Sequence, residues 1–299
     1  MSLCLHLLYC RITDVTTTQV LVSGLFTKVS SDSLSLYGSE AAAAKAVGHE
    51  ARAAAAIASV QSDVMVAPTV AVHYRGIAMS VSAKLPVSDA TLVYGYACIL
   101  CAVFFVLARI YRHSLVSVLV CCCFACRSRS SDGGRTVRDT SPSMRAAMKQ
   151  LGAKLNLKPH IVNRIDTAAS TATGGGGVSA GDTGVQLYLG GDVEGHEVVG
   201  VYSRGMYAVD VARTFPAEMP VSGEPGSVLR RQLRPELVIR NPQPLSSDVF
   251  TRWGAHSARE HNEEVIAATH RLVTSCVARA AARLDAGERD VATVLHSEG

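Results

Sequence analysis

Two apolar runs at the centre of the chain dominate its hydrophobic pattern. Residues 90–108 contain no charged side chain, and as a helix at about 1.5 Å per residue they span roughly 28 Å, close to the hydrocarbon thickness of a bilayer. The second run, 114–126, is too short to cross alone; it fits the return half of a hairpin, a bent continuation or an interfacial segment. The pattern predicts a membrane anchor at residues 90–126, with a buried core helix as the alternative.

The N-terminal region, residues 1–89, carries one strong helical signal. Alanine dominates residues 38–62, and Ser39 is suited to cap a helix that begins after it. Before this helix, residues 16–25 predict a short strand or an apolar loop, and after it residues 65–81 predict one or two strands.

A basic, flexible linker is expected at residues 127–184, because serine, arginine and glycine prevail in its first part and glycine recurs at 174–177. Inside it, residues 143–156 predict an amphipathic helix with Met144, Met148 and Leu151 on one face. That helix could lie on a membrane, contact RNA phosphates or pack on the following domain.

Residues 185–299 predict a small C-terminal α+β domain. A capping box at 257–260 opens a long helix to about residue 284, with Val273, Cys276 and Val277 in its apolar stripe. The strands are expected at 185–189, 197–202, 206–212 and 237–240. The whole chain is thus predicted as α+β and membrane-anchored, with an alanine-rich N-terminal helix, one span or a short hairpin, the linker and this domain.

The formal net charge of +4 hides an uneven distribution: residues 91–164 carry a net charge of +9, whereas 165–299 carry −5. A basic excess after a span marks the cytosolic side and attracts anionic headgroups. The expected contacts to lipid or RNA phosphates are Arg109, Arg112, Arg127, Arg129, Arg135, Arg138, Arg145, Lys149, Lys154 and Lys158.

Four cysteines, Cys121, Cys122, Cys123 and Cys126, lie beside the predicted anchor. This position is suited to S-palmitoylation, and the alternative is that cysteine serves as a small apolar residue. Adjacent cysteines are poorly placed to bridge each other, and no second ligand cluster has zinc spacing. They are therefore candidates for lipid attachment.

Catalytic and metal-binding patterns are scarce. His256, His261 and His270 are spaced five and nine apart, so no pair shares a helix face, and no metal or cofactor is predicted. Asp210 and Arg213 are interpreted as an ion pair at a strand end. Because no Gly-x-Ser-x-Gly, Walker or dinucleotide motif occurs, a non-enzymatic role is favoured.

Residues 241–265, which begin Asn-Pro-Gln-Pro-Leu-Ser-Ser-Asp, resemble the first motif of the methyltransferase-guanylyltransferase capping domains of noda-like and tombus-like positive-strand RNA viruses. The resemblance implies that His256 is the motif histidine that holds the transferred guanylate. The family's Asp-x-x-Arg pair follows that histidine, but here it lies upstream at Asp210, and the later tyrosine is missing. The resemblance therefore implies a non-catalytic or truncated replication accessory protein.

The leading expectation is a viral replication protein that tethers the RNA replication complex to a host organelle membrane, with its C-terminal domain in the cytosol. An RNA-capping fragment and a membrane adaptor without a nucleic-acid role are the alternatives. The expected partners are anionic lipids, RNA, a viral polymerase and further copies of the chain on the membrane.

Overall fold

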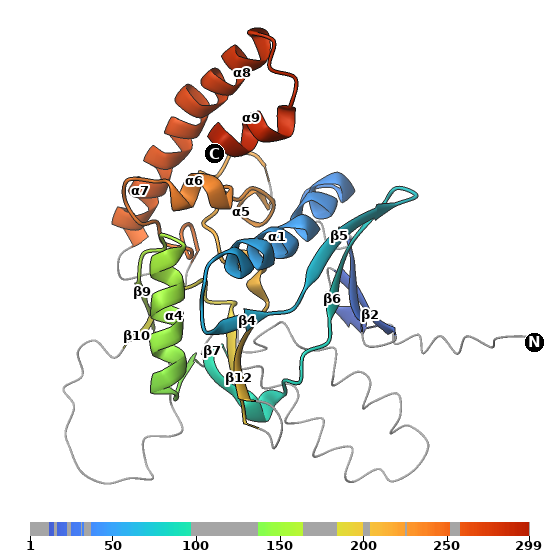
Figure 1. Cartoon of the computed structure of the whole chain (residues 1–299), viewed down its shortest axis with the longest axis vertical. Coiled ribbons are helices and arrows are strands. Elements are labelled where there is room, and N and C mark those ends of the chain that lie inside the picture. The colour runs from blue at the N-terminus through green and yellow to red at the C-terminus, as the bar shows by residue number, and fades with distance from the viewer. Residues whose placement is uncertain are drawn as a thin grey trace, which may run out of the picture.

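The computed structural model describes residues 12–14, 17–22, 25–30, 32, 37–96, 137–163, 184–199, 204–224, 226–251 and 258–298. These residues form two five-stranded sheets, one two-stranded sheet, two longer helices that pack on the sheets and a group of C-terminal helices (Figure 1). The α+β class inferred from the sequence therefore fits the structure.

The first sheet is formed by the N-terminal part of the chain in the order β1-β2-β3-β6-β5, with every neighbouring pair antiparallel. Valine and threonine recur in these strands, as expected for residues on a pleated surface. The bounds are β1 Ile12–Asp14, β2 Thr17–Val22, β3 Leu25–Ser30, β5 Thr69–Tyr74 and β6 Ile77–Ala83.

The second sheet has the order β4-β12-β11-β7-β8, and β4 runs parallel to β12 whereas the other pairs are antiparallel. It unites strands from distant parts of the chain. The bounds are β4 Val64–Val66, β7 Leu92–Tyr96, β8 Val137–Asp139, β11 Glu194–Val199 and β12 Arg204–Val209. A separate pair, β9 His160–Asn163 and β10 Gly184–Leu187, lies beside it.

Helix α1, Glu40–Ser59, is the helix predicted from the alanine-rich stretch, and the Ser39 hydroxyl accepts a hydrogen bond from the Ala42 amide as its N-cap. The helix packs on β3, β5 and β6 with one face. Other residues contact the segment after β12 and two short helices, α5 (Ser227–Arg230) and α6 (Pro235–Ile239). Small alanine side chains allow this close approach on two sides, so α1 joins the first sheet to the rest of the molecule (Figure 1).

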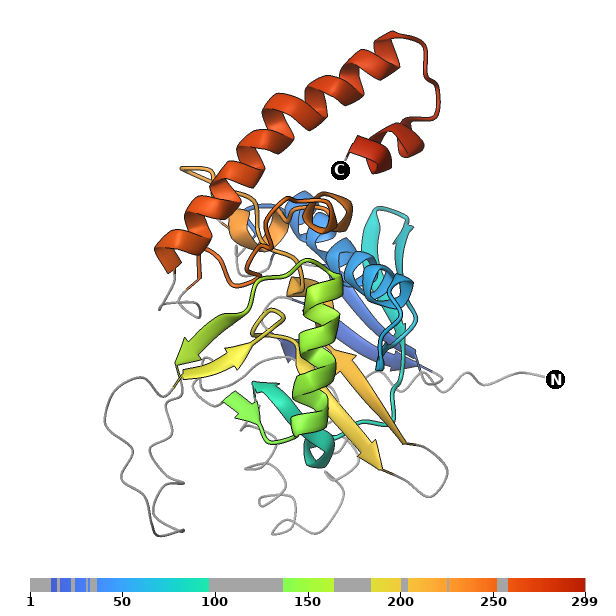
Figure 2. The same ribbon diagram turned by 60° about the vertical axis from the view of Figure 1, so that its left-hand side comes forward.

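Helix α4, Pro142–Lys154, is the predicted amphipathic helix, although its N-cap is Ser141. Met144, Met148 and Leu151 are fully buried, and the helix crosses the second sheet against β4, β7 and β11 (Figure 2). Of the three environments considered for this helix, the structure shows packing in the core.

The C-terminal helices begin with α5 Ser227–Arg230 and α6 Pro235–Ile239, and the strand predicted at 237–240 is wrong because a proline-led turn forms α6 there. The long helix that follows consists of α7 Ala258–Arg271, a π-helical segment Leu272–Cys276 and α8 Val277–Asp285, and α9 Val291–Glu298 folds back on it (Figure 2). The π turn shifts the apolar stripe, so Val273 and Val277 are exposed while Cys276 is buried.

The predicted membrane-anchored architecture is contradicted at its first residues. Leu92–Tyr96 form β7 between β11 and β8, and Tyr94, which lies within the predicted span, is only 1% exposed with its hydroxyl accepting a hydrogen bond from the Tyr188 amide. A continuous apolar run does not distinguish a helix from a strand buried on both faces. None of the helices in the described ranges is both long and apolar enough to cross a bilayer, and residues 97–126 lie outside those ranges.

Candidate functional site

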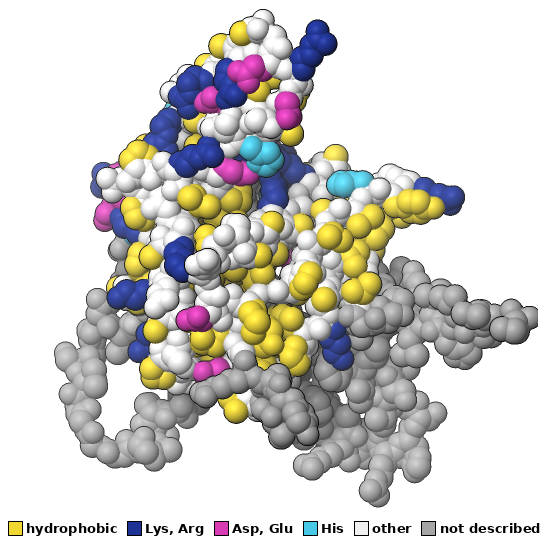
Figure 3. Space-filling model, viewed as in Figure 1, with side chains coloured by type: hydrophobic (Ala, Val, Ile, Leu, Met, Phe, Trp, Pro, Cys, Tyr) yellow, Lys and Arg dark blue, Asp and Glu magenta, His cyan; other side chains and the backbone are white. Residues whose placement is uncertain are grey.

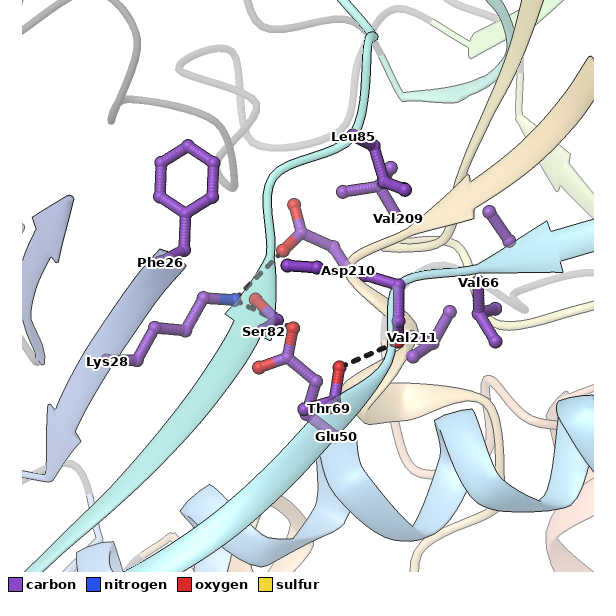
Figure 4. Close-up of a pocket in the computed structure, with 13 residues that line it drawn as sticks. Phe26, Lys28, Glu50, Val66, Thr69, Ser82, Leu85, Val209, Asp210 and Val211 are labelled. Carbon is purple, nitrogen blue, oxygen red and sulfur yellow. Dashed lines mark hydrogen bonds and ion pairs between the residues drawn. The ribbon is translucent and has the colours of Figure 1, made fainter. Parts of the chain in front are cut away.

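A lysine and two carboxylates meet between the two sheets, and we call Lys28, Glu50 and Asp210 the lysine cluster. The Lys28 ammonium donates to Asp210 Oδ1 at 3.1 Å and to Glu50 Oε1 at 3.3 Å (Figure 4). The other Glu50 oxygen accepts a hydrogen bond from the Ser80 hydroxyl at 3.1 Å. The three charged side chains are only 23%, 13% and 12% exposed.

Each member of the cluster is placed by a different element. Lys28 lies on β3, Glu50 on α1, and Asp210 directly follows β12. Asp210 has a left-handed backbone conformation, with φ 55° and ψ 42°, which is uncommon for residues other than glycine and tolerated by aspartate. This conformation turns the chain into the short 3-10 turn Val211–Arg213.

The cluster contains one ammonium for two carboxylates. Burial alone lowers the pKa of Lys28, but the charges and hydrogen bonds of Asp210 and Glu50 outweigh it and raise that pKa above its ordinary value. Burial raises the pKa of Asp210 to about 7, against the opposing effect of Lys28 and with an added rise from the carboxylates of Glu194 and Glu50. Lys28 is therefore charged at neutral pH, whereas Asp210 exchanges its proton there.

This charge imbalance predicts a pH-dependent difference in stability. Because the pKa of Asp210 is raised in the folded state, its contribution to stability is complete below about pH 4 and is lost as the pH rises through about 7. Relative to the unchanged protein, Asp210→Asn should gain about 4 kcal/mol in free energy of unfolding between pH 4 and pH 8, because the pKa of Asp210 is raised from 3.8 to about 7 and each pKa unit corresponds to about 1.4 kcal/mol. Urea unfolding at several pH values measures this difference. Asp63→Asn, at an exposed position, is the matched control, and a difference that does not vary with pH would contradict the assignment.

A second buried network holds the turn at residues 190–192. Asp248 Oδ2 accepts hydrogen bonds from the Gly191 amide at 2.7 Å and from His160 Nε2 at 2.8 Å. Burial alone raises the pKa of Asp248, but the hydrogen bond and charge of His160 bring it below its ordinary value. The carboxylate is therefore ionised and accepts both bonds, which fixes the turn against the core.

The turn and the segment after Asp210 lie against each other. The Arg213 guanidinium forms an ion pair with Asp192 at 3.3 Å. A Cβ atom on Gly190 would lie 2.3 Å from the Arg213 carbonyl oxygen, so only glycine permits this approach. The ion pair predicted between Asp210 and Arg213 is wrong, because Asp210 pairs with Lys28 and Arg213 with Asp192.

A pocket opens over the lysine cluster. It encloses about 610 Å³ of space, part of it open solvent, and its apolar walls come from Phe26, Val66, Leu85 and Val209 (Figure 4). Phe26 and Lys28 are two residues apart on β3, so both point to the same face of the strand. The pocket thus combines an apolar mouth with a charged floor.

Of the basic residues predicted to contact phosphates, the structure describes Arg138, Arg145, Lys149, Lys154 and Lys158. Arg138 donates to the Leu92 carbonyl, Arg145 pairs with Asp139, and Lys158 pairs with Glu260 and Glu264. Lys149 and Lys154 are exposed on α4. Figure 3 shows Lys and Arg side chains at many places on one face of the molecule. Their assignment to phosphate contacts stays a prediction.

The other predicted site residues lie outside the described ranges. They are Arg109, Arg112, Arg127, Arg129 and Arg135, the cysteines Cys121, Cys122, Cys123 and Cys126, and His256.

Sequence patterns did not single out Lys28, Glu50, Asp192 or Asp248. A usable signal was present: Lys28 lies between the apolar residues Phe26 and Val29, and Asp210 directly follows the apolar end of β12. Charges in such places are rarely buried without a partner. The partner, however, lies far away in the sequence.

A segment of the chain that includes part of the site and of the folded core matches the model of a known protein family. Residues 126–220 match the family model CLU, clustered mitochondria. The CLU match covers about a third of the chain, from β8 to beyond the Val211–Arg213 turn, and it includes Asp192 and Asp210 but not Lys28 or Glu50. No curated protein matches the chain, and no solved structure matches it.

The CLU match corrects the expectation of a viral replication protein. The family comparison finds the CLU model and no viral replication family. The predicted kinship with viral capping domains is therefore wrong, and so are the predicted tethering, capping and membrane-adaptor roles. The structure gives the physical reason. In the Pro-Leu-Ser-Ser-Asp stretch, Leu245 is fully buried and Asp248 anchors the 190–192 turn, so these residues stabilise the core. The expected partners and location stay predictions.

Proposed function

We propose that this chain takes part in the distribution of mitochondria through its CLU-like segment. The observation that carries the proposal is the match of residues 126–220 to the clustered-mitochondria model. The matched residues include α4, β11 and β12, which form part of the molecule's central packing. They also include both residues of the Arg213–Asp192 ion pair.

The test is loss of the chain in its own cells, followed by imaging of the mitochondria. We expect the mitochondria to gather into clusters and to regain their distribution when the unchanged protein is restored. Unaltered mitochondria after complete loss of the chain would overturn the proposal.

A pair of arginine variants locates the effect. Arg213→Ala removes the ion pair with Asp192 inside the CLU match, whereas Arg259→Ala changes an arginine outside the match whose side chain is 92% exposed. We expect Arg259→Ala to restore the mitochondrial distribution and Arg213→Ala to restore it only in part. Protein levels of both variants are measured in the same cells, because a variant that is degraded says nothing about the segment.

A further inference from the structure

The lysine cluster has an unsatisfied carboxylate oxygen directed into the pocket. Asp210 Oδ1 binds Lys28, whereas the buried Oδ2 has no hydrogen-bond partner among the described residues and points away from Lys28 (Figure 4). A buried unpaired carboxylate oxygen is costly. Hard divalent cations such as Mg²⁺ take carboxylate oxygens as ligands, and a cation here would satisfy Oδ2 and offset the excess negative charge.

The cation would need further oxygen ligands from a bound molecule. Among the described residues, no group of three His, Cys, Asp or Glu side chains is placed to hold a metal ion. Mg²⁺ is commonly bound through one or two carboxylates together with substrate phosphates. The Lys28 ammonium has three N–H donors, of which two are directed to Glu50 and Asp210. Among the described residues the third meets no acceptor, so it can bind a phosphate oxygen.

The walls of the pocket indicate what the phosphates are attached to. Phe26, Val66, Leu85 and Val209 form an apolar lining next to the charged floor. A ligand with a flat apolar ring at one end and phosphates at the other matches this division, and small-molecule sites combine an apolar lining with a few convergent polar groups in this way.

The order of elements around the cluster supports the same ligand. Three strands precede a helix and two strands follow it in the same sheet, with the lysine on the third strand paired to a glutamate of the helix. An aspartate directly follows a later strand, β12. Protein kinases hold ATP phosphates and Mg²⁺ with a lysine, glutamate and aspartate in these positions.

Two features of this chain differ from those of a protein kinase, so the proposal concerns binding of the ligand and not phosphoryl transfer. Residues 1–36 contain a single glycine, Gly24, so a glycine-rich phosphate loop is missing there. The turn that packs against the segment after Asp210 reads Gly190-Gly191-Asp192 in place of the His-Arg-Asp of a kinase catalytic loop. We propose that the pocket binds a nucleoside triphosphate together with a divalent cation, with Lys28 on the phosphates, Asp210 on the cation and Glu50 positioning Lys28.

The experiment is calorimetric titration of the full-length chain with ATP, in the presence and absence of Mg²⁺, at pH 7.5. We expect saturable binding that requires both components, because each supplies ligands that the other lacks. Lys28→Met should weaken binding about tenfold or more, as expected for loss of a charge-assisted hydrogen bond. Asp210→Asn should abolish the requirement for Mg²⁺ and weaken binding. Lys45→Met, an exposed lysine of the same chain, should bind as the unchanged protein does.

Two further arms keep the test decisive. Lys28→Arg retains the positive charge and therefore the fold, which circular dichroism checks, but it moves the N–H donors. Its affinity for ATP should therefore fall while its melting temperature stays close to that of the unchanged protein.

Pyrophosphate with Mg²⁺ should bind more weakly than ATP, because it lacks the ring that the apolar wall contacts. Equal affinity for pyrophosphate would overturn the nucleoside assignment, and no heat of binding at millimolar ATP and Mg²⁺ would overturn the proposal. Neither outcome bears on the mitochondrial role, which is tested in cells.

Discussion

Asp248→Ala should lower the free energy of unfolding at pH 7 by about 3–5 kcal/mol, as expected when one partner of a buried charged network is removed. Both the Gly191 amide and His160 Nε2 bind the same oxygen of Asp248, and the side chains of Asp248 and His160 are 2% and 1% exposed. Alanine would leave both donors buried without an acceptor. Urea unfolding followed by circular dichroism measures the loss.

Asp248→Asn separates the charge from the shape of this side chain. Asparagine keeps an acceptor for the Gly191 amide, so its cost should be smaller than that of alanine. Because the pKa of Asp248 is lowered in the folded state, its stabilising charge is present above the ordinary aspartate pKa and is lost as the pH falls through the lower folded value. The difference between Asp248→Asn and the unchanged protein should therefore shrink toward pH 3. Asp285→Ala, at an exposed aspartate, should change stability by less than about 0.5 kcal/mol. An Asp248→Ala variant as stable as this control would contradict the anchoring role.

Gly95→Ala should destabilise the fold by about 3 kcal/mol or more, because it combines backbone strain with overpacking. Gly95 lies in β7 with φ +91°, and a Cβ atom there would lie 2.3 Å from the Val193 carbonyl oxygen and 3.3 Å from the Glu194 Cα. These are backbone atoms of the neighbouring segment and cannot move aside as a flexible side chain can. Thermal and urea unfolding measure the effect.

The same substitution decides between a strand and a membrane helix at residues 92–96. In a helix, replacing glycine by alanine is favourable by about 1 kcal/mol, so a stabilised Gly95→Ala variant would contradict β7. Gly48→Ala is the matched control, since Gly48 lies within α1 and nothing lies within 4 Å of an added Cβ. We expect Gly48→Ala to stabilise the protein by about 0.5–1 kcal/mol.

Local signals predicted several elements well. The capping serine and alanine-rich composition predicted α1, and apolar spacing predicted α4, because both depend on residues within a few positions of each other. The β-branched runs predicted strands at 197–202 and 206–212, and the structure forms the antiparallel pair β11 and β12 there with bounds shifted by a few residues. The long C-terminal helix was also predicted, but its π turn was not, so the positions of Val273 and Val277 were wrong.

The candidate site had almost no local signal. Lys28 and Asp210 are 182 positions apart, and Glu50 stands in a helix whose sequence is mostly alanine. Asp248 lies in a stretch whose short motif suggested another family. The neighbouring residues in the sequence do not identify the partner that neutralises each buried charge, because ion pairing depends on distance in space.

The amino-acid sequence by itself determined the α+β class, the helices at α1 and α4, the strands at β11 and β12 and the uneven charge, since propensity, periodicity and composition act over short stretches of chain. Only the tertiary structure decided that the apolar residues 92–96 are a strand rather than the start of a span, because β11 and β8 supply the hydrogen bonds that define it. It also decided the lysine cluster, where packing of the first sheet and α1 against the end of β12 brings three charges into one pocket. Contacts of that kind are made by the fold as a whole, and their energies depend on burial that no short segment possesses alone.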